Sequence, residues 1–155
     1  MTLPGFLVDT AWLNDQLGAT DLRILDATVF LHVNTDGPGY TTESGRAKFD
    51  AGHLPGAQFV DLIEVFSDQT SAVRFTMPSP PRFCELAGAL GVGDDSRVVV
   101  YSSGSPMWAT RLWWMFRPVG FDQCAVLNGG PVSYTHLTLP TNDLGESSED
   151  AGALK

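Results

Sequence analysis

The distribution of apolar and polar residues along the chain predicts strands that alternate with helices. Residues 98–101 form a β-branched and aromatic run without polar alternation, which is typical of a strand covered on both faces. A short polar loop follows, and then a helix for which Ser105 is a suitable N-cap and Pro106 a suitable first residue. We therefore expect this loop at the carboxyl end of a buried strand, where a helix N-terminus attracts anions.

The flanking segments continue the pattern. A helix capped by Asp9 or Thr10 is expected to end near Gly18, and residues 22–27, 56–61 and 124–127 are expected to be strands. Residues 79–91 have an early proline and a glycine stop, which predict a helix whose inner face carries Phe83, Leu86, Ala87 and Leu90. Residues 31–48 are expected to be an excursion or a long loop, and residues 63–78 irregular. Together these elements predict an α/β fold with a central parallel sheet and helices on both faces, in three layers.

The helix that begins at Pro106 is apolar around most of its circumference. Such a helix is either deeply buried in its own domain or partly covered by a partner domain. We favour the second interpretation for Trp113 and Trp114, because exposed tryptophan patches usually mark contact sites.

Composition limits the classes of function. The 155 residues suit one domain, and the formal net charge of −9 argues against nucleic acid and anionic membrane as main partners. No apolar run reaches transmembrane length and the N-terminus lacks a basic region before an apolar one, so we expect a cytoplasmic protein. Cys84 and Cys124 match no metal spacing. Two reduced core thiols are favoured over a disulfide, and no metal or cofactor is expected.

Residues 49–60 carry a specific motif: Phe49, three further residues, His53, an apolar residue, Pro55-Gly56-Ala57 and, after Gln58, the apolar residues Phe59 and Val60. This segment resembles the N-terminal signature of rhodaneses. Asp26 at a strand end and residues 91–95 and 127–130 also look like that family, whereas residues 111–114 resemble the first domain of two-domain rhodaneses. The resemblance runs over residues 6–130, which we take as one rhodanese-like domain.

The resemblance implies a parallel sheet of about five strands and sulfur-transfer chemistry. In this family a cysteine at the start of the loop attacks thiosulfate or 3-mercaptopyruvate, becomes a persulfide and passes sulfur to cyanide or a thiol. The loop amides would lower the pKa of that thiol and hold the substrate anion.

This sequence departs from the family at the decisive position, because Ser102 occupies the place of the cysteine. A serine cannot carry a persulfide, and neither Cys84 in a helix nor Cys124 in a distant strand can substitute for the cysteine. We therefore expect no catalytic residue in this chain. The candidate site is the loop itself, which could hold a small sulfur-containing anion, although it contains no Arg or Lys: Ser102, Ser103, Gly104, Ser105, Pro106 and Met107.

Three functions remain to be weighed. First domains of two-domain rhodaneses commonly lack the cysteine, so the leading hypothesis is the non-catalytic N-terminal half of a sulfurtransferase, with a second, catalytic rhodanese domain as partner. The alternative is a stand-alone inactive module that binds a protein through Trp113 and Trp114. A serine hydrolase that pairs Ser102 with His53 is disfavoured, because glycines do not flank the serine and His53 is expected to fix the turn before Pro55.

Residues 131–155 match nothing expected of the family. Residues 131–140 could form an added strand, whereas residues 141–155 are rich in Gly, Ser and acidic residues. We expect this segment to be a disordered, truncated or out-of-frame tail.

Overall fold

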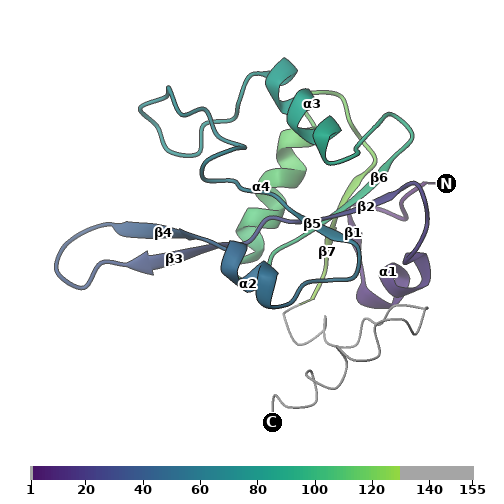
Figure 1. Cartoon of the computed structure of the whole chain (residues 1–155), viewed down its shortest axis with the longest axis horizontal. Coiled ribbons are helices and arrows are strands. Elements are labelled where there is room, and N and C mark those ends of the chain that lie inside the picture. The colour runs from purple at the N-terminus through teal and green to yellow at the C-terminus, as the bar shows by residue number, and fades with distance from the viewer. Residues whose placement is uncertain (1, 130–155) are drawn as a thin grey trace, which may run out of the picture.

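The structure is a computed structural model that describes residues 2–129, so the predictions for residues 131–155 lie outside the described residues. Its centre is a five-stranded sheet in the order β1-β7-β6-β2-β5, in which every neighbouring pair is parallel (Figure 1). The predicted parallel sheet is thereby confirmed. Its strands are β1 (Leu7–Val8), β2 (Leu22–Asp26), β5 (Ala57–Phe59), β6 (Arg97–Tyr101) and β7 (Cys124–Leu127).

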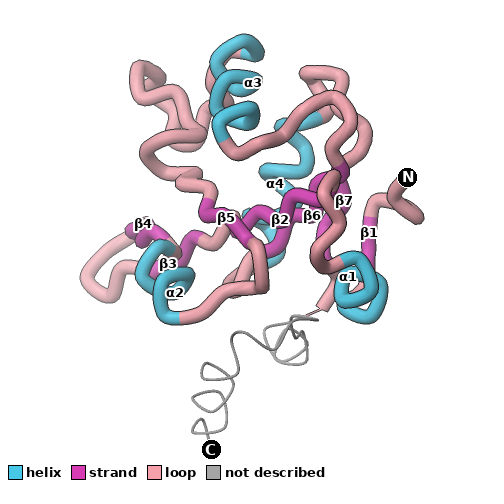
Figure 2. Tube along the Cα trace, turned by 45° about the vertical axis from the view of Figure 1, so that its right-hand side comes forward, coloured by secondary structure: helices cyan, strands magenta, loops and turns pink. Residues whose placement is uncertain are grey.

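Helices cover both faces of this sheet, as predicted. In Figure 2 the strands form a band across the molecule, with α3 on one side and α1 and α2 on the other. Alternate residues of β6 point to the two faces: Val98 and Val100 pack in the cluster that includes α3 and α4, whereas Val99 and Tyr101 pack with α1 and α2. All of β6 is buried, which explains its continuous apolar run. The helices are α1 (Thr10–Gln16), α2 (Arg46–Ala51), α3 (Pro80–Ala89) and α4 (Pro106–Phe116).

Helix α4 forms where the sequence predicts it. The Ser105 hydroxyl accepts a hydrogen bond from the Met107 amide at 3.3 Å, and Pro106 opens the helix. Burial within the domain is confirmed for most of its apolar surface, whereas cover by a partner domain stays a prediction. Trp113 is half-buried within the domain and Trp114 is 53% exposed, so Trp114 has the larger surface left for a partner.

Residues 31–48 are an excursion from the main sheet, and the alternative prediction of a long loop is wrong. Most of this segment is an antiparallel hairpin of β3 (Val29–Val33) and β4 (Tyr40–Ser44), followed directly by α2. The turn-forming residues 34–39 form only its connection, where the Asn34 amide donates to the Gly39 carbonyl at 3.1 Å. The prediction failed because the strong turn residues at the tip hid the two flanking strands, of which β4 is polar.

Helix α3 forms where the sequence predicts it, but the side chains that it buries differ in part from the prediction. It begins at Pro80 without a side-chain hydrogen bond from Ser79. Phe83 and Ala87 are buried, but Leu86 and Leu90 are only partly covered. The prediction of two core thiols is wrong for Cys84, which lies on the exposed side of α3, and right for Cys124, which is buried in β7.

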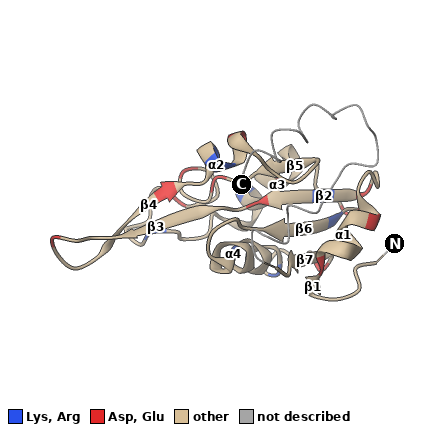
Figure 3. Cartoon of the chain, turned by 90° about the horizontal axis from the view of Figure 1, so that it is seen from below, with Lys and Arg blue, Asp and Glu red and all other residues tan. Residues whose placement is uncertain are grey.

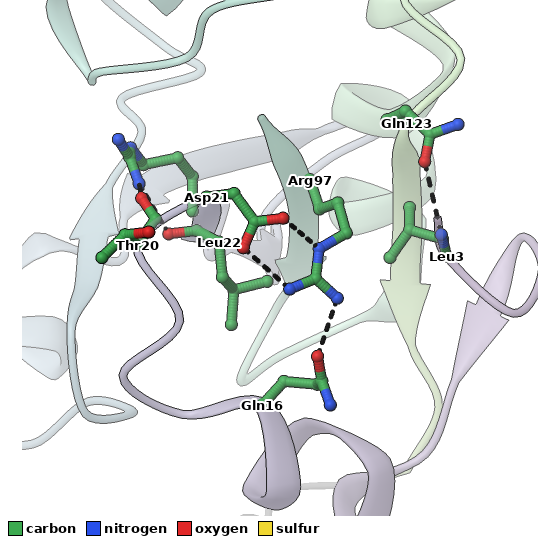
Figure 4. Close-up of polar contacts among 8 residues, drawn as sticks. Leu3, Gln16, Thr20, Asp21, Leu22, Arg97 and Gln123 are labelled. Carbon is green, nitrogen blue, oxygen red and sulfur yellow. Dashed lines mark hydrogen bonds and ion pairs between the residues drawn. The ribbon is translucent and has the colours of Figure 1, made fainter. Parts of the chain in front are cut away.

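An ion pair with a buried guanidinium connects β6 to the turn before β2 at the amino end of the sheet (Figure 4). Arg97 in β6 donates through Nε to the Asp21 carboxylate at 2.7 Å and through a second nitrogen at 2.9 Å. The same guanidinium donates to Gln16 at 2.8 Å. These bonds allow a charged side chain to be almost completely buried at the start of a strand.

Candidate functional site

The predicted site loop lies at the carboxyl end of β6, in front of α4. Ser102 is only 5% exposed, and its hydroxyl oxygen accepts a hydrogen bond from the Gly104 amide at 3.3 Å. Any nucleophilic atom on residue 102 would therefore face a backbone donor of the loop, next to the positive end of the helix dipole. The residues that the sequence assigns to the loop thus share one short turn of chain.

A second loop, from the neighbouring strand β2, supports the first. Asp26 accepts hydrogen bonds from the amide of Thr28, at 2.9 Å, and from its hydroxyl. The Thr28 hydroxyl oxygen in turn accepts from the Ser103 amide at 2.9 Å. This buried chain of bonds fixes the two loops to each other, and it leaves the Ser103 amide engaged within the protein.

A cavity of about 430 Å³ adjoins the loop. It lies between the first turns of α4 and the carboxyl ends of β7 and β1, and no charged side chain lines it. The neighbouring Arg111 is directed elsewhere, because it donates to the carbonyl of Phe75, and burial lowers the pKa of its guanidinium. The lining residues are Leu7, Ser102, Gly104, Pro106, Ala109, Thr110, Val126, Leu127, Asn128 and Gly129.

His53 has the turn-fixing contacts that the sequence predicts. Its ring stacks on Phe49 with centroids 3.9 Å apart, and its Nδ1 lies 2.8 Å from the Phe49 carbonyl, to which only a protonated Nδ1 can donate. The next amide, of Leu54, donates to the Tyr101 hydroxyl at 3.2 Å. No hydrogen bond among the described residues joins His53 to Ser102, so the structure offers no support for a serine–histidine pair.

Neither cysteine lines the cavity. Burial raises the pKa of the Cys124 thiol far above its usual range, which keeps it protonated. In the described part of the chain, no three His, Cys, Asp or Glu residues gather to hold a metal ion. No helix within residues 2–129 is long and apolar enough to cross a membrane.

Two residues that shape the site escaped the sequence analysis. Thr28 bridges the two loops, and Phe30 in β3 packs so close to Gly104 that a Cβ there would lie 3.3 Å from the phenyl ring. The only sequence signal was the position of Thr28 two residues after Asp26, a spacing that suits a local side-chain turn.

Comparison with known proteins decides the family. The model of the rhodanese-like domain family matches residues 9–136. The chain belongs to this family. This rhodanese-like domain is 38% identical over 130 residues to thiosulfate sulfurtransferase of Cricetulus griseus, and 33% identical over 125 residues to 3-mercaptopyruvate sulfurtransferase of Escherichia coli K12. The matches cover 80% and 81% of this chain but only 41% and 42% of those proteins.

Solved structures give the same result. The crystal structure of a 3-mercaptopyruvate sulfotransferase from Escherichia coli superimposes with a TM-score of 0.70 and 30% identity, over 86% of this chain and 47% of the other. A sulfur transferase subunit of yeast mitochondrial complex I superimposes with a TM-score of 0.64 and 29% identity, over 81% of this chain and 39% of the other. The rhodanese-like domain thus spans about two fifths of the length of its curated relatives.

Proposed function

We propose that this rhodanese-like domain is the non-catalytic first half of a two-domain sulfurtransferase for thiosulfate or 3-mercaptopyruvate. The observation that carries the proposal is Ser102, a serine at the strand end where the family has its sulfur-carrying cysteine. The chain's match to about two fifths of each relative supports it, because that is the share that one of two similar domains would have.

The chemistry explains why this position matters. A cysteine thiolate attacks the outer sulfur of thiosulfate, the sulfur–sulfur bond breaks with its electron pair on the departing sulfite, and a persulfide remains on the protein. A cyanide or thiolate acceptor then takes that sulfur and restores the thiolate. The Ser102 hydroxyl is too weakly acidic to form the nucleophile, and it cannot carry a persulfide. In the proposal, the second domain therefore carries out catalysis.

In this proposal, the domain packs against its catalytic partner and shapes one wall of the cleft. In the proposal, the loop of residues 102–107 holds a small sulfur-containing anion near the start of α4, where the Gly104 amide would exchange the Ser102 hydroxyl for the anion. Cytoplasmic localisation and the exclusion of nucleic acid and membrane as partners remain predictions.

A second candidate rests on Trp114. Its indole is 53% exposed near the end of α4, and a large exposed aromatic ring favours a binding surface. A stand-alone inactive module that binds a partner protein through this side chain is the alternative function. The complete reading frame distinguishes the two, because only the first requires a second domain with a loop cysteine.

The activity prediction follows directly from Ser102. The 155-residue chain should form no thiocyanate from thiosulfate and cyanide, because its site loop holds no thiol. The matched control is the Cys84→Ser, Cys124→Ser double variant, which removes both thiols of the chain. Turnover that persists in this double variant would contradict the proposal, because a group other than a cysteine thiol would then carry out the reaction.

The variant Ser102→Cys tests whether the loop still has the geometry of the nucleophile site. The new thiolate would accept a hydrogen bond from the Gly104 amide and face the start of α4. Both effects stabilise the thiolate, so the pKa of the thiol should fall below the usual ~8.5. The pH dependence of alkylation by a small reagent measures this pKa. The background must be Cys84→Ser, because Cys84 is exposed, whereas buried Cys124 should stay unreactive in the folded protein. A labelling rate and pKa equal to those of an unfolded peptide would contradict the site assignment.

A further inference from the structure

The β3–β4 hairpin is the part of the described chain with the largest unexplained apolar exposure. It projects from the side of the domain in Figures 1 and 3, away from the three layers. Val33 is 81% exposed, Tyr40 is 47% exposed and Leu31 is 41% exposed. A two-stranded hairpin is at best marginally stable when it stands alone in water. Exposed apolar side chains on such a hairpin therefore indicate a surface that another part of a protein covers.

These side chains gather on one face. Val33 pairs with Tyr40 and Leu31 pairs with Thr42 across the two strands, and alternate residues of a strand share a face. The same face begins with buried Val29, so the apolar strip continues outward from the hydrophobic core. The opposite face begins with half-buried Phe30 and is polar further out, where His32 and Glu43 form an exposed ion pair at 2.6 Å. We call the strip of Leu31, Val33, Tyr40 and Thr42 the apolar hairpin face.

The position of the hairpin indicates what would cover this face. The hairpin starts three residues beyond Asp26, at the carboxyl end of β2, where Phe30, on the face opposite the apolar hairpin face, lies beside Gly104 of the candidate loop. Since the sheet is parallel, β7 also ends at this edge, and the described residues end two positions later at Gly129. Gly129, the last described residue, therefore lies at the edge of the sheet at which the hairpin begins.

The relatives are much longer than the part that matches this chain. The aligned parts are 41% and 42% of the two sulfurtransferases, so more than half of each lies outside the match. Trp114 is a separate feature: α4 runs back from this edge, and seven residues of helix carry Trp114 about 10 Å away from Met107. The apolar hairpin face is thus better placed than Trp114 to meet a domain that joins the chain at the carboxyl edge.

We propose that the apolar hairpin face is a docking surface for the second domain of the same polypeptide, which contacts it through an apolar patch. This inference rests on the proposed function, because it requires that second domain. The polar face with His32 and Glu43 remains in water, which sets the orientation of the hairpin against its partner.

Amide hydrogen exchange tests the docking. The complete polypeptide encoded by the reading frame is compared with the 155-residue chain. Docking should slow exchange of residues 31–42 by roughly tenfold or more in the complete polypeptide, while buried β6 exchanges slowly in both. The double variant Leu31→Thr, Val33→Thr places β-branched residues, which favour strands, at both positions but removes apolar surface, and it should abolish most of that protection. The matched control is His32→Thr on the polar face, which should leave the protection unchanged.

The other outcomes separate the two proposals. A complete polypeptide without a second domain overturns the proposed function, and the docking proposal with it. A two-domain polypeptide whose residues 31–42 exchange as fast as in the 155-residue chain overturns only the docking proposal. Protection that appears in the 155-residue chain alone and rises with its concentration also overturns it, because the partner would then be a second copy of this chain.

Discussion

At the scale of single residues, the guanidinium of Arg97 is a buried charge that is paired with a carboxylate. It is 2% exposed, and its carboxylate partner is Asp21, which lies in the turn before β2. The ring of Trp12 lies 5.8 Å from the guanidinium carbon and covers it. Breaking such a pair from one side is costly, because the remaining charge stays buried without compensation.

The variant Asp21→Asn should therefore lower stability at neutral pH. The hydrogen bonds from Arg97 lower the pKa of the Asp21 carboxyl, so the folded state binds its proton more weakly than the unfolded state. The stability from this pair is present above the unfolded pKa of about 3.9 and is lost as pH falls through the lower folded pKa. Urea midpoints should differ between wild type and variant at pH 7 and converge in strong acid.

The control for that experiment is Asp50→Asn. Asp50 forms an exposed ion pair with Arg46 on α2, four residues away, so its loss should change the urea midpoint little at any pH. Equal changes in the urea midpoint of the two variants would show that burial of Arg97 does not increase the contribution of its ion pair to stability.

At the scale of elements, the two adjacent tryptophans of α4, Trp113 and Trp114, have different surroundings. The Trp113 indole donates to the Cys124 carbonyl at 2.9 Å and meets the Phe6 ring edge-on at 5.6 Å. These contacts join the helix to β7 and to the segment before β1. Trp114, one position further around the helix, is more than half exposed and has no such role.

Substitution by glutamine should reveal this difference. Trp113→Gln should lower the free energy of unfolding by about 1–3 kcal/mol, because it loses ring packing and an indole hydrogen bond. Trp114→Gln should stay within about 0.5 kcal/mol of wild type and should reduce self-association. Urea unfolding and sedimentation velocity measure the two effects. A large loss of stability in Trp114→Gln would show that its ring belongs to the core.

Elements were predictable from sequence where local signals and burial agree. The apolar run of β6, the serine and proline at the start of α4 and the proline and glycine around α3 all mark their elements independently of distant contacts. The β3–β4 hairpin lacked such agreement, because turn residues dominate its centre and β4 is polar. In the site, Ser102 was identifiable from the residues before it, but Thr28 and Phe30 reach the loop only through the pairing of β2 with β6, a contact between distant segments.

At the scale of the whole molecule, the two ends of the described chain meet in the sheet. The Val126 amide of β7 donates to the Phe6 carbonyl at 2.8 Å, and the Asn128 amide donates to the Val8 carbonyl at 2.7 Å. The Arg117 guanidinium lies 4.9 Å from the Phe6 ring and 5.0 Å from the Trp113 ring, so a cation and two aromatic rings hold the N-terminal segment in place. Strand β1 thus covers an edge of the sheet that would otherwise be open.

Deletion of residues 2–8 should therefore destabilise the whole domain and promote aggregation. The deletion exposes the edge of β7, with its unpaired amides and its apolar residues, to pairing with other chains. Thermal unfolding should begin at a lower temperature, and light scattering should rise with protein concentration. The control is deletion of residues 2–4, which keeps β1 and loses only the Leu3 contacts, including its 3.3 Å hydrogen bond to Gln123. If both deletions leave a monomer with the wild-type unfolding temperature, the first strand is dispensable, and β7 is a stable edge without it.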